Sequence, residues 1–165
     1  MNKVDTELLS FFSEIQAAQQ RIKPFIPTTP ISDSFSISEE TGKTVRLKWD
    51  NKLRTGSFKE RGALNFLLSM TPEERAQGVI AASAGNHALG VSYYAQKLGV
   101  PCHLIMPVNA PLVKVGSCRS FGAKIIFRPT LQDAIISAKE SAQQDNLTYL
   151  PPYDHLFTTK LHSWP

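Results

Sequence analysis

One short stretch decides the expected fold, because an apolar run passes there into a loop of small polar residues: Gly78-Val79-Ile80-Ala81-Ala82-Ser83-Ala84-Gly85-Asn86-His87. The run from Val79 to Ala82 does not alternate with polar residues, which is typical of a strand buried on both faces. The pattern after His87 predicts a helix to about Leu98. A strand that leads through a short loop into a helix is the first half of a βαβ unit.

The same alternation continues downstream. Apolar segments predict strands at 101–106, 123–127 and 147–150, and periodic segments predict helices at 111–121 and 131–143. Short strands that alternate with helices indicate a parallel sheet with right-handed crossovers. The expected fold class is therefore α/β, with a parallel sheet flanked by helices.

The residues upstream predict a more irregular part of the chain. Their pattern indicates a helix at 6–21, a short helix beginning within Ser32–Ser38, a strand at 44–49 and a helix start at Thr71. Prolines at 24, 27 and 30 end the first helix and force an extended segment after it.

A lysine stands where the chain turns into another helix, in the stretch Thr55-Gly56-Ser57-Phe58-Lys59-Glu60-Arg61-Gly62. The leucines that follow have helical spacing, so Lys59 is expected in the first turn of a helix capped by Thr55 or Ser57. The positive end of the helix dipole favours the neutral amine, and burial would favour it further. A neutral amine can form a Schiff base with an aldehyde, so Lys59 is the candidate nucleophile. The alternative is a solvated surface lysine beside Glu60 and Arg61.

Ser83–His87 is a second candidate site, because ligands of a parallel sheet bind at the carboxyl ends of its strands. A strand that leads into a helix leaves amide N–H groups that can bind an anion such as a carboxylate. Ser83 and Asn86 add side-chain donors suited to a carboxylate or a phenolic oxygen, whereas capping or packing could be the whole role of His87. A tight turn without a ligand is the alternative.

A nucleotide-binding domain is another possible use of an α/β sheet. Such domains carry a G-x-G-x-x-G or G-x-x-x-x-G-K-[ST] pattern after a strand. Neither pattern follows any of the expected strands, which excludes this class.

The composition is that of about one globular domain, with 165 residues of which 42% are apolar and 19% charged. No apolar run could span a membrane, and the N-terminus lacks the layout of a signal peptide, so we expect a cytoplasmic protein. The net charge of +4 comes from dispersed side chains, which argues against nucleic acid as a partner and fits small anionic ligands. Cys102 and Cys118 lack metal-ligand spacing, so we expect two buried thiols and no metal site or disulfide.

Taken together, the two candidate stretches resemble a known family. Ser57–Gly62, with Ser83–His87 beginning 24 residues after Lys59, resembles the threonine dehydratase and serine racemase group of pyridoxal-phosphate (PLP) enzymes, which have fold type II, the tryptophan-synthase-β-like fold. The likeness extends from about Arg21 to about His155. It includes Ile22–Pro30, Lys97–Pro101, Gly122-Ala123 and Pro152-Tyr153-Asp154-His155.

The resemblance implies a role for each candidate residue. Lys59 would hold PLP covalently, with Phe58 packed on one face of the pyridine ring and Asn86 bonded to the ring's 3-oxygen. Ser83, Asn86 and His87 would bind the carboxylate of a small amino-acid substrate. The cofactor would absorb charge as the α-proton leaves, and the freed Lys59 would be the base.

The implied activity is that of an ammonia-lyase (dehydratase), which converts threonine to 2-oxobutanoate, or serine to pyruvate, and releases ammonia. Such an enzyme would serve amino-acid metabolism, for example isoleucine biosynthesis. Racemases of the group use a serine where this chain has Ala84, so serine racemase ranks below dehydratase. A 3-hydroxyaspartate dehydratase is a further alternative of lower rank, to which Ala84 does not apply. The alternative from another class is a non-catalytic remnant of such an enzyme.

The resemblance also implies a division of the chain. Residues 1–55 would be the incomplete N-terminal part of a large PLP domain, residues 56–150 a small α/β domain and residues 151–165 a divergent tail. Members of the group continue into a large domain with a glycine-rich phosphate loop that this sequence lacks, so a C-terminally truncated chain is expected. The full-length relatives are expected to be homo-oligomers.

Overall fold

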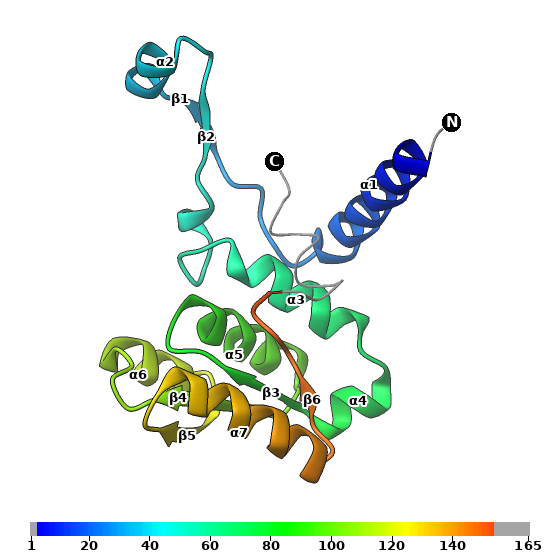
Figure 1. Ribbon diagram of the computed structural model, residues 1–165, viewed down its shortest axis with the longest axis vertical. Helices are drawn as coiled ribbons and strands as arrows, with labels where there is room; N and C mark the ends of the chain where they lie inside the picture. Colours follow the sequence, from blue (N-terminus) through cyan, green and yellow to red (C-terminus); the bar gives the residue numbers. More distant parts are fainter. Residues whose placement is uncertain (1–2, 154–165) are drawn as a thin grey trace.

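The computed structural model describes residues 3–153 (Figure 1). Most of the predicted tail, including Asp154 and His155, lies outside the described residues. From residue 79 onwards, strands alternate with helices as predicted. The α/β fold class, with a parallel sheet flanked by helices, is confirmed.

A four-stranded sheet lies at the centre and is formed by β3 (Val79–Ala82), β4 (Cys102–Pro107), β5 (Lys124–Arg128) and β6 (Thr148–Tyr149). The strand order is β5-β4-β3-β6, so β3 is an inner strand between β4 and β6. All neighbouring strands in this sheet are parallel. Each strand predicted for this sheet is present, with its ends within one residue of the prediction.

Helices cover both faces of this sheet (Figure 1). α5 (Asn86–Leu98) and α6 (Leu112–Ser120) lie on one face, and α7 (Leu131–Gln144) lies on the other. Alternate side chains of β3 lie on opposite faces of the sheet. Val79 and Ala81 pack in the cluster that includes α5, and Ile80 and Ala82 pack against α7. Because both faces are buried, the strand is apolar throughout.

A further helix packs outside α5. α3 (Lys59–Ser69) lies along α5 and leads to α4 (Pro72–Gln77), whose predicted start is confirmed by a capping box between Thr71 and Glu74. α3 and α5 approach closely at Gly90. A Cβ atom at this position would lie 3.0 Å from the Cα atom of Glu60 and 3.2 Å from its backbone nitrogen. The absence of a side chain at Gly90 therefore permits this helix spacing.

The N-terminal helix α1 (Lys3–Ile22) packs against α3 and extends the core. It begins three residues before the predicted start and ends one residue later. Ala18 and Ile22, together with Ile26 and Leu53, belong to the same buried cluster as the sheet residues. The assignment of residues 1–55 to a separate domain stays a prediction.

A small antiparallel hairpin follows α1 and stands apart from the central sheet (Figure 1). It consists of β1 (Ile31–Asp33) and β2 (Arg46–Lys48), with α2 (Phe35–Thr41) between them. The short helix predicted to begin within Ser32–Ser38 is confirmed, since α2 begins at Phe35. Ser32 itself lies in β1, where it pairs with Leu47. Phe35 is 79% exposed, so this part buries little apolar surface within the described residues.

An ion pair joins the segment after the hairpin to α3. Asp50, in the 3-10 turn η1 (Asp50–Lys52), accepts hydrogen bonds from Arg61 Nε at 2.8 Å and Arg61 Nη2 at 2.9 Å. Thr29 Oγ1 donates to the same carboxylate at 2.7 Å. Burial raises the pKa of the Asp50 carboxyl, but these hydrogen bonds and the charges of Arg61 and Lys48 outweigh it and lower the pKa below the ordinary value of 3.8.

Three further observations concern residues 3–153 alone. None of their helices has the length and apolar character needed to cross a bilayer. They contain no group of histidine, cysteine and acidic side chains arranged to hold a metal ion. Cys102 and Cys118 are buried free thiols, as predicted.

We expect Gly90→Ala to destabilise the chain. The new Cβ atom would meet the Glu60 backbone at 3.0–3.2 Å, and overpacking of this kind costs about 1–3 kcal/mol. The matched control is Gly116→Ala in α6, because nothing lies within 4 Å of that Cβ position. There, the helix propensity of alanine should raise stability by up to about 1 kcal/mol. Urea unfolding measures the free energy of unfolding of both variants. Equal changes in the two variants would contradict the close approach at Gly90.

We expect Asp50→Asn to lower the free energy of unfolding at neutral pH by about 1–3 kcal/mol, since it removes charged hydrogen bonds from Arg61. The pKa of Asp50 is lowered by folding, so its contribution is complete above the ordinary value of 3.8 and is lost as pH falls through the lowered pKa. The deficit of the variant should therefore shrink in acid. Asp33→Asn is the control, because the Asp33–Arg46 pair is exposed and should contribute less than about 1 kcal/mol. A deficit independent of pH would refute this assignment.

Candidate functional site

Lys59 is the first residue of α3, so its predicted place in the first helical turn is confirmed. The predicted cap is wrong, because Phe58 precedes the helix and no side chain caps it. Thr55 is engaged elsewhere: its backbone N–H and its hydroxyl donate to Glu60 Oε2 at 2.7 and 2.6 Å. Ser57 Oγ is buried and has no hydrogen-bond partner among residues 3–153. The start of α3 is therefore held by Glu60 and not by a capping residue.

Glu60 is fully buried and is absent from the predicted site residues. Its Oε1 atom accepts a hydrogen bond from the Tyr94 hydroxyl of α5 at 3.3 Å. Burial raises the pKa of the Tyr94 hydroxyl, and the charge of Glu60 raises it further, so Tyr94 keeps its proton and donates. An acidic residue in the first turn of a helix was the available sequence signal. The carboxylate joins α3 to α5 and to the loop at Thr55.

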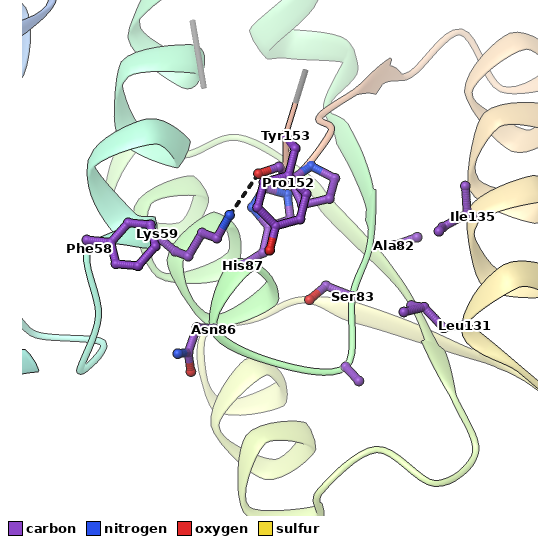
Figure 2. Close-up of a pocket in the computed structure, with 11 residues that line it drawn as sticks. Phe58, Lys59, Ala82, Ser83, Asn86, His87, Leu131, Ile135, Pro152 and Tyr153 are labelled. Atoms are coloured by element: carbon purple, nitrogen blue, oxygen red, sulfur yellow. Dashed lines mark hydrogen bonds between the residues drawn. The ribbon is translucent and has the colours of Figure 1, made fainter. Parts of the chain in front are cut away.

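The Lys59 side chain is directed into the protein. Its Nζ atom donates to the carbonyl oxygen of Pro152 at 2.9 Å, the dashed line in Figure 2. The same atom lies 3.5 Å from the centre of the Tyr153 ring. Lys59 is only 7% exposed, so the alternative of a solvated surface lysine is wrong. Burial lowers the pKa of the amine, which increases its neutral, nucleophilic fraction.

A cavity of about 510 Å³ adjoins the Lys59 amine at the carboxyl end of β3. The structure brings all five predicted site residues to this cavity: Phe58, Lys59, Ser83, Asn86 and His87. Leu131 and Ile135 of α7 line it on the side away from Phe58 (Figure 2). Its volume lies in the range of about 300–1,000 Å³ that is typical of small-molecule sites.

The loop after β3 contributes the start of α5 to the cavity. Gly85 is the residue before this helix, and no side chain caps it. Ser83 Oγ accepts a hydrogen bond from the Gly85 amide at 3.1 Å. The His87 ring is buried, and its Nε2 atom lies 3.1 Å from the carbonyl oxygen of Leu150. The positive end of the α5 dipole therefore lies beside the cavity, where it favours an anion.

Asn86 is held by a residue from a different helix. Lys114 Nζ, in α6, donates to Asn86 Oδ1 at 2.7 Å. The amide group of Asn86 points away from the Lys59 amine in Figure 2. Lys114 is not among the predicted site residues, because its segment has the pattern of an ordinary helix.

Comparison with known proteins gives the same family as the resemblance of the two sequence stretches, that of pyridoxal-phosphate enzymes. The family model described as "Pyridoxal-phosphate dependent enzyme" matches residues 22–163. An L-threo-3-hydroxyaspartate ammonia-lyase from Pseudomonas sp. is 38% identical over 148 residues, which cover 89% of this chain and 46% of that protein. A catabolic L-threonine dehydratase from Staphylococcus aureus strain N315 is 39% identical over 146 residues, which cover 87% of this chain and 42% of that protein.

A solved structure supports the fold as well. Serine racemase from Dictyostelium discoideum matches with a TM-score of 0.81 and 33% identity, over 88% of this chain and 48% of that one. The chain spans less than half the length of each of these three proteins. The family match covers most of the chain and includes every predicted site residue. This chain therefore belongs to the family of pyridoxal-phosphate dependent enzymes.

Proposed function

We propose that this chain forms part of an ammonia-lyase that converts threonine to 2-oxobutanoate, or serine to pyruvate, with release of ammonia. The observation that carries the proposal is the Lys59 amine, which is buried, has a lowered pKa and adjoins a cavity at the carboxyl end of β3. Two relatives are named as an ammonia-lyase and a dehydratase, which supports lyase chemistry.

The residues around the cavity suit PLP. Phe58 is 44% exposed, which leaves aromatic surface available for packing against a pyridine ring. No carboxylate among residues 3–153 pairs with the Lys59 amine, so the amine can condense with an aldehyde. Asn86 would donate to the 3-oxygen of the ring. When bound, PLP supplies an electron-poor ring that stabilises negative charge at the substrate α-carbon.

Lys59 would hold the cofactor and, once released, take the α-proton of the substrate at its Nζ atom. Its lowered pKa keeps part of the amine neutral and able to accept that proton. The Pro152 carbonyl oxygen, 2.9 Å from Nζ, orients the amine by accepting a hydrogen bond. Since the amine adjoins the cavity, the base lies close to any substrate bound there.

The substrate carboxylate would bind beside the start of α5. The helix dipole and the loop from Ser83 to Asn86 favour an anion there. Ser83 and Asn86 would donate from their side chains. His87 would contribute chiefly by holding the loop, because its buried ring contacts the Leu150 carbonyl group.

Three observations bear on the alternative functions. Ala84 lines the cavity and has no group that could exchange a proton, which favours elimination over racemisation. The relative named as an L-threo-3-hydroxyaspartate ammonia-lyase supports that substrate as an alternative. A non-catalytic remnant is the alternative from another class, and it is favoured by the exposure of Phe58 and Tyr153, which are 44% and 61% exposed within the described residues.

We expect the chain to capture PLP through Lys59. Incubation with PLP, reduction with borohydride and peptide mass mapping should place one phosphopyridoxyl group on the peptide that contains Lys59. Lys59→Arg keeps the positive charge but cannot condense with the aldehyde, so it should lose the label. Lys139→Arg is the control, because Lys139 is an exposed lysine on α7. Labelling spread over exposed lysines would contradict the assignment of Lys59.

Addition of threonine or serine to the PLP-loaded chain tests the catalytic proposal separately. Release of ammonia together with a 2-oxo acid would support an ammonia-lyase. Labelling of Lys59 without product would instead favour the remnant.

The pH dependence of labelling tests the environment of Lys59. Burial lowers its pKa from the ordinary value of 10.5, so the neutral amine is present at lower pH than in an exposed lysine. Labelling of Lys59 should therefore reach half its maximum below that value. A half-maximum at or above 10.5, measured by quantitative mass spectrometry, would refute the effect of burial.

A further inference from the structure

Lys114 lies over the loop that leads into α5, although it belongs to α6. Its Nζ atom is 2.7 Å from Asn86 Oδ1, and a Cβ atom at Gly85 would lie 3.5 Å from the same nitrogen. The lysine amine thus bonds to Asn86 and lies in the space beside Gly85, the residue before it. This contact joins a residue of the cavity wall to a helix that does not itself line the cavity in the described residues.

The position of Lys114 is electrostatically unfavourable for the helix beside it. A cation near a helix N-terminus faces the positive end of the dipole. The hydrogen bond to Asn86 offsets this repulsion, and an anion bound nearby would offset it further. The stability of α5 by itself therefore does not account for a lysine at this place.

The chemistry of the two side chains determines the orientation of the Asn86 amide. A lysine ammonium has three donors and no acceptor, so it must face the oxygen of the amide. The Asn86 NH₂ group is then left as a donor, and within residues 3–153 it has no hydrogen-bond acceptor. Asn86 itself lines the cavity that contains Lys59.

We propose that Lys114 is a positioning residue that orients the Asn86 amide, so that its NH₂ group is presented to the negatively charged 3-oxygen of the cofactor ring. Lys114 acts through Asn86 and does not itself touch the cofactor. The inference rests on the proposed function, because it assigns Asn86 the same partner.

The inference predicts different effects for different replacements. Lys114→Arg keeps a side chain that can only donate, and should preserve the orientation. Lys114→Met removes the donor and leaves the amide free to rotate. Lys114→Glu can only accept, so it should draw the NH₂ group to itself and turn the amide oxygen towards the ring oxygen.

The test measures the dissociation constants of PLP and of 3-deoxypyridoxal 5′-phosphate for the 165-residue chain and each variant. The second compound keeps the aldehyde and the phosphate but lacks the 3-oxygen, so it controls for altered charge and altered folding. Lys139→Glu on α7 controls for the change in net charge. The readout is binding, and it requires no catalytic turnover.

A hydrogen bond to a charged group is worth about tenfold to a hundredfold in affinity. Lys114→Glu should therefore weaken PLP binding by about tenfold or more, and Lys114→Met should weaken it less. Lys114→Arg should match the unaltered chain. The 3-deoxy compound should bind all of these chains with the same affinity. PLP should bind the Lys139→Glu chain with the same affinity as the unaltered chain.

Two results would overturn the inference: no effect of Lys114→Glu on PLP binding, or an equal loss for both compounds. If the unaltered chain bound neither compound, the proposed function would fail instead. Nitrogen-15 NMR of the ligand-free chain then decides whether Lys114 contacts the Asn86 amide. The Asn86 NH₂ signals should shift in Lys114→Met and stay in place in Lys114→Arg, and unshifted signals in Lys114→Met would exclude the contact.

Discussion

The buried carboxylate of Glu60 is the interaction on which the candidate site depends. It accepts hydrogen bonds from the backbone and hydroxyl of Thr55 and from the Tyr94 hydroxyl, so it connects a loop, α3 and α5. A hydrogen bond to a charged group contributes about 1.5–3 kcal/mol, and a buried charge without partners would be strongly destabilising. Lys59 is the adjacent residue, so the position of its backbone follows from the position of Glu60.

The strand order explains why the Lys59 amine meets Pro152. β6 pairs with β3, and the chain leaves β6 at the same edge of the sheet as the loop from Ser83 to His87. α3 lies outside α5, with its first turn beside that edge, so three segments distant in sequence meet at one cavity. The parallel sheet places the ends of its strands together, and α3 adds the lysine.

Much of the central fold was predictable from local pattern. A strand buried on both faces must be apolar at every position, and this is why β3 was recognisable in the sequence with its correct ends. The hairpin of β1 and β2 was not predicted as a pair. Ser32 has no local signal for a strand, and its conformation depends on pairing with Leu47, fifteen residues away.

Sequence by itself determined the α/β class, the parallel sheet, the place of Lys59 in the first turn of a helix and five of the residues that line one cavity. These features follow from periodicity and from local motifs, which neighbouring residues specify. Tertiary structure alone decided that Glu60 holds the start of α3, that the Pro152 carbonyl group binds the Lys59 amine and that Lys114 contacts Asn86. Each of these contacts joins different elements, and it arises only when packing buries a charge or brings a donor within reach of an acceptor.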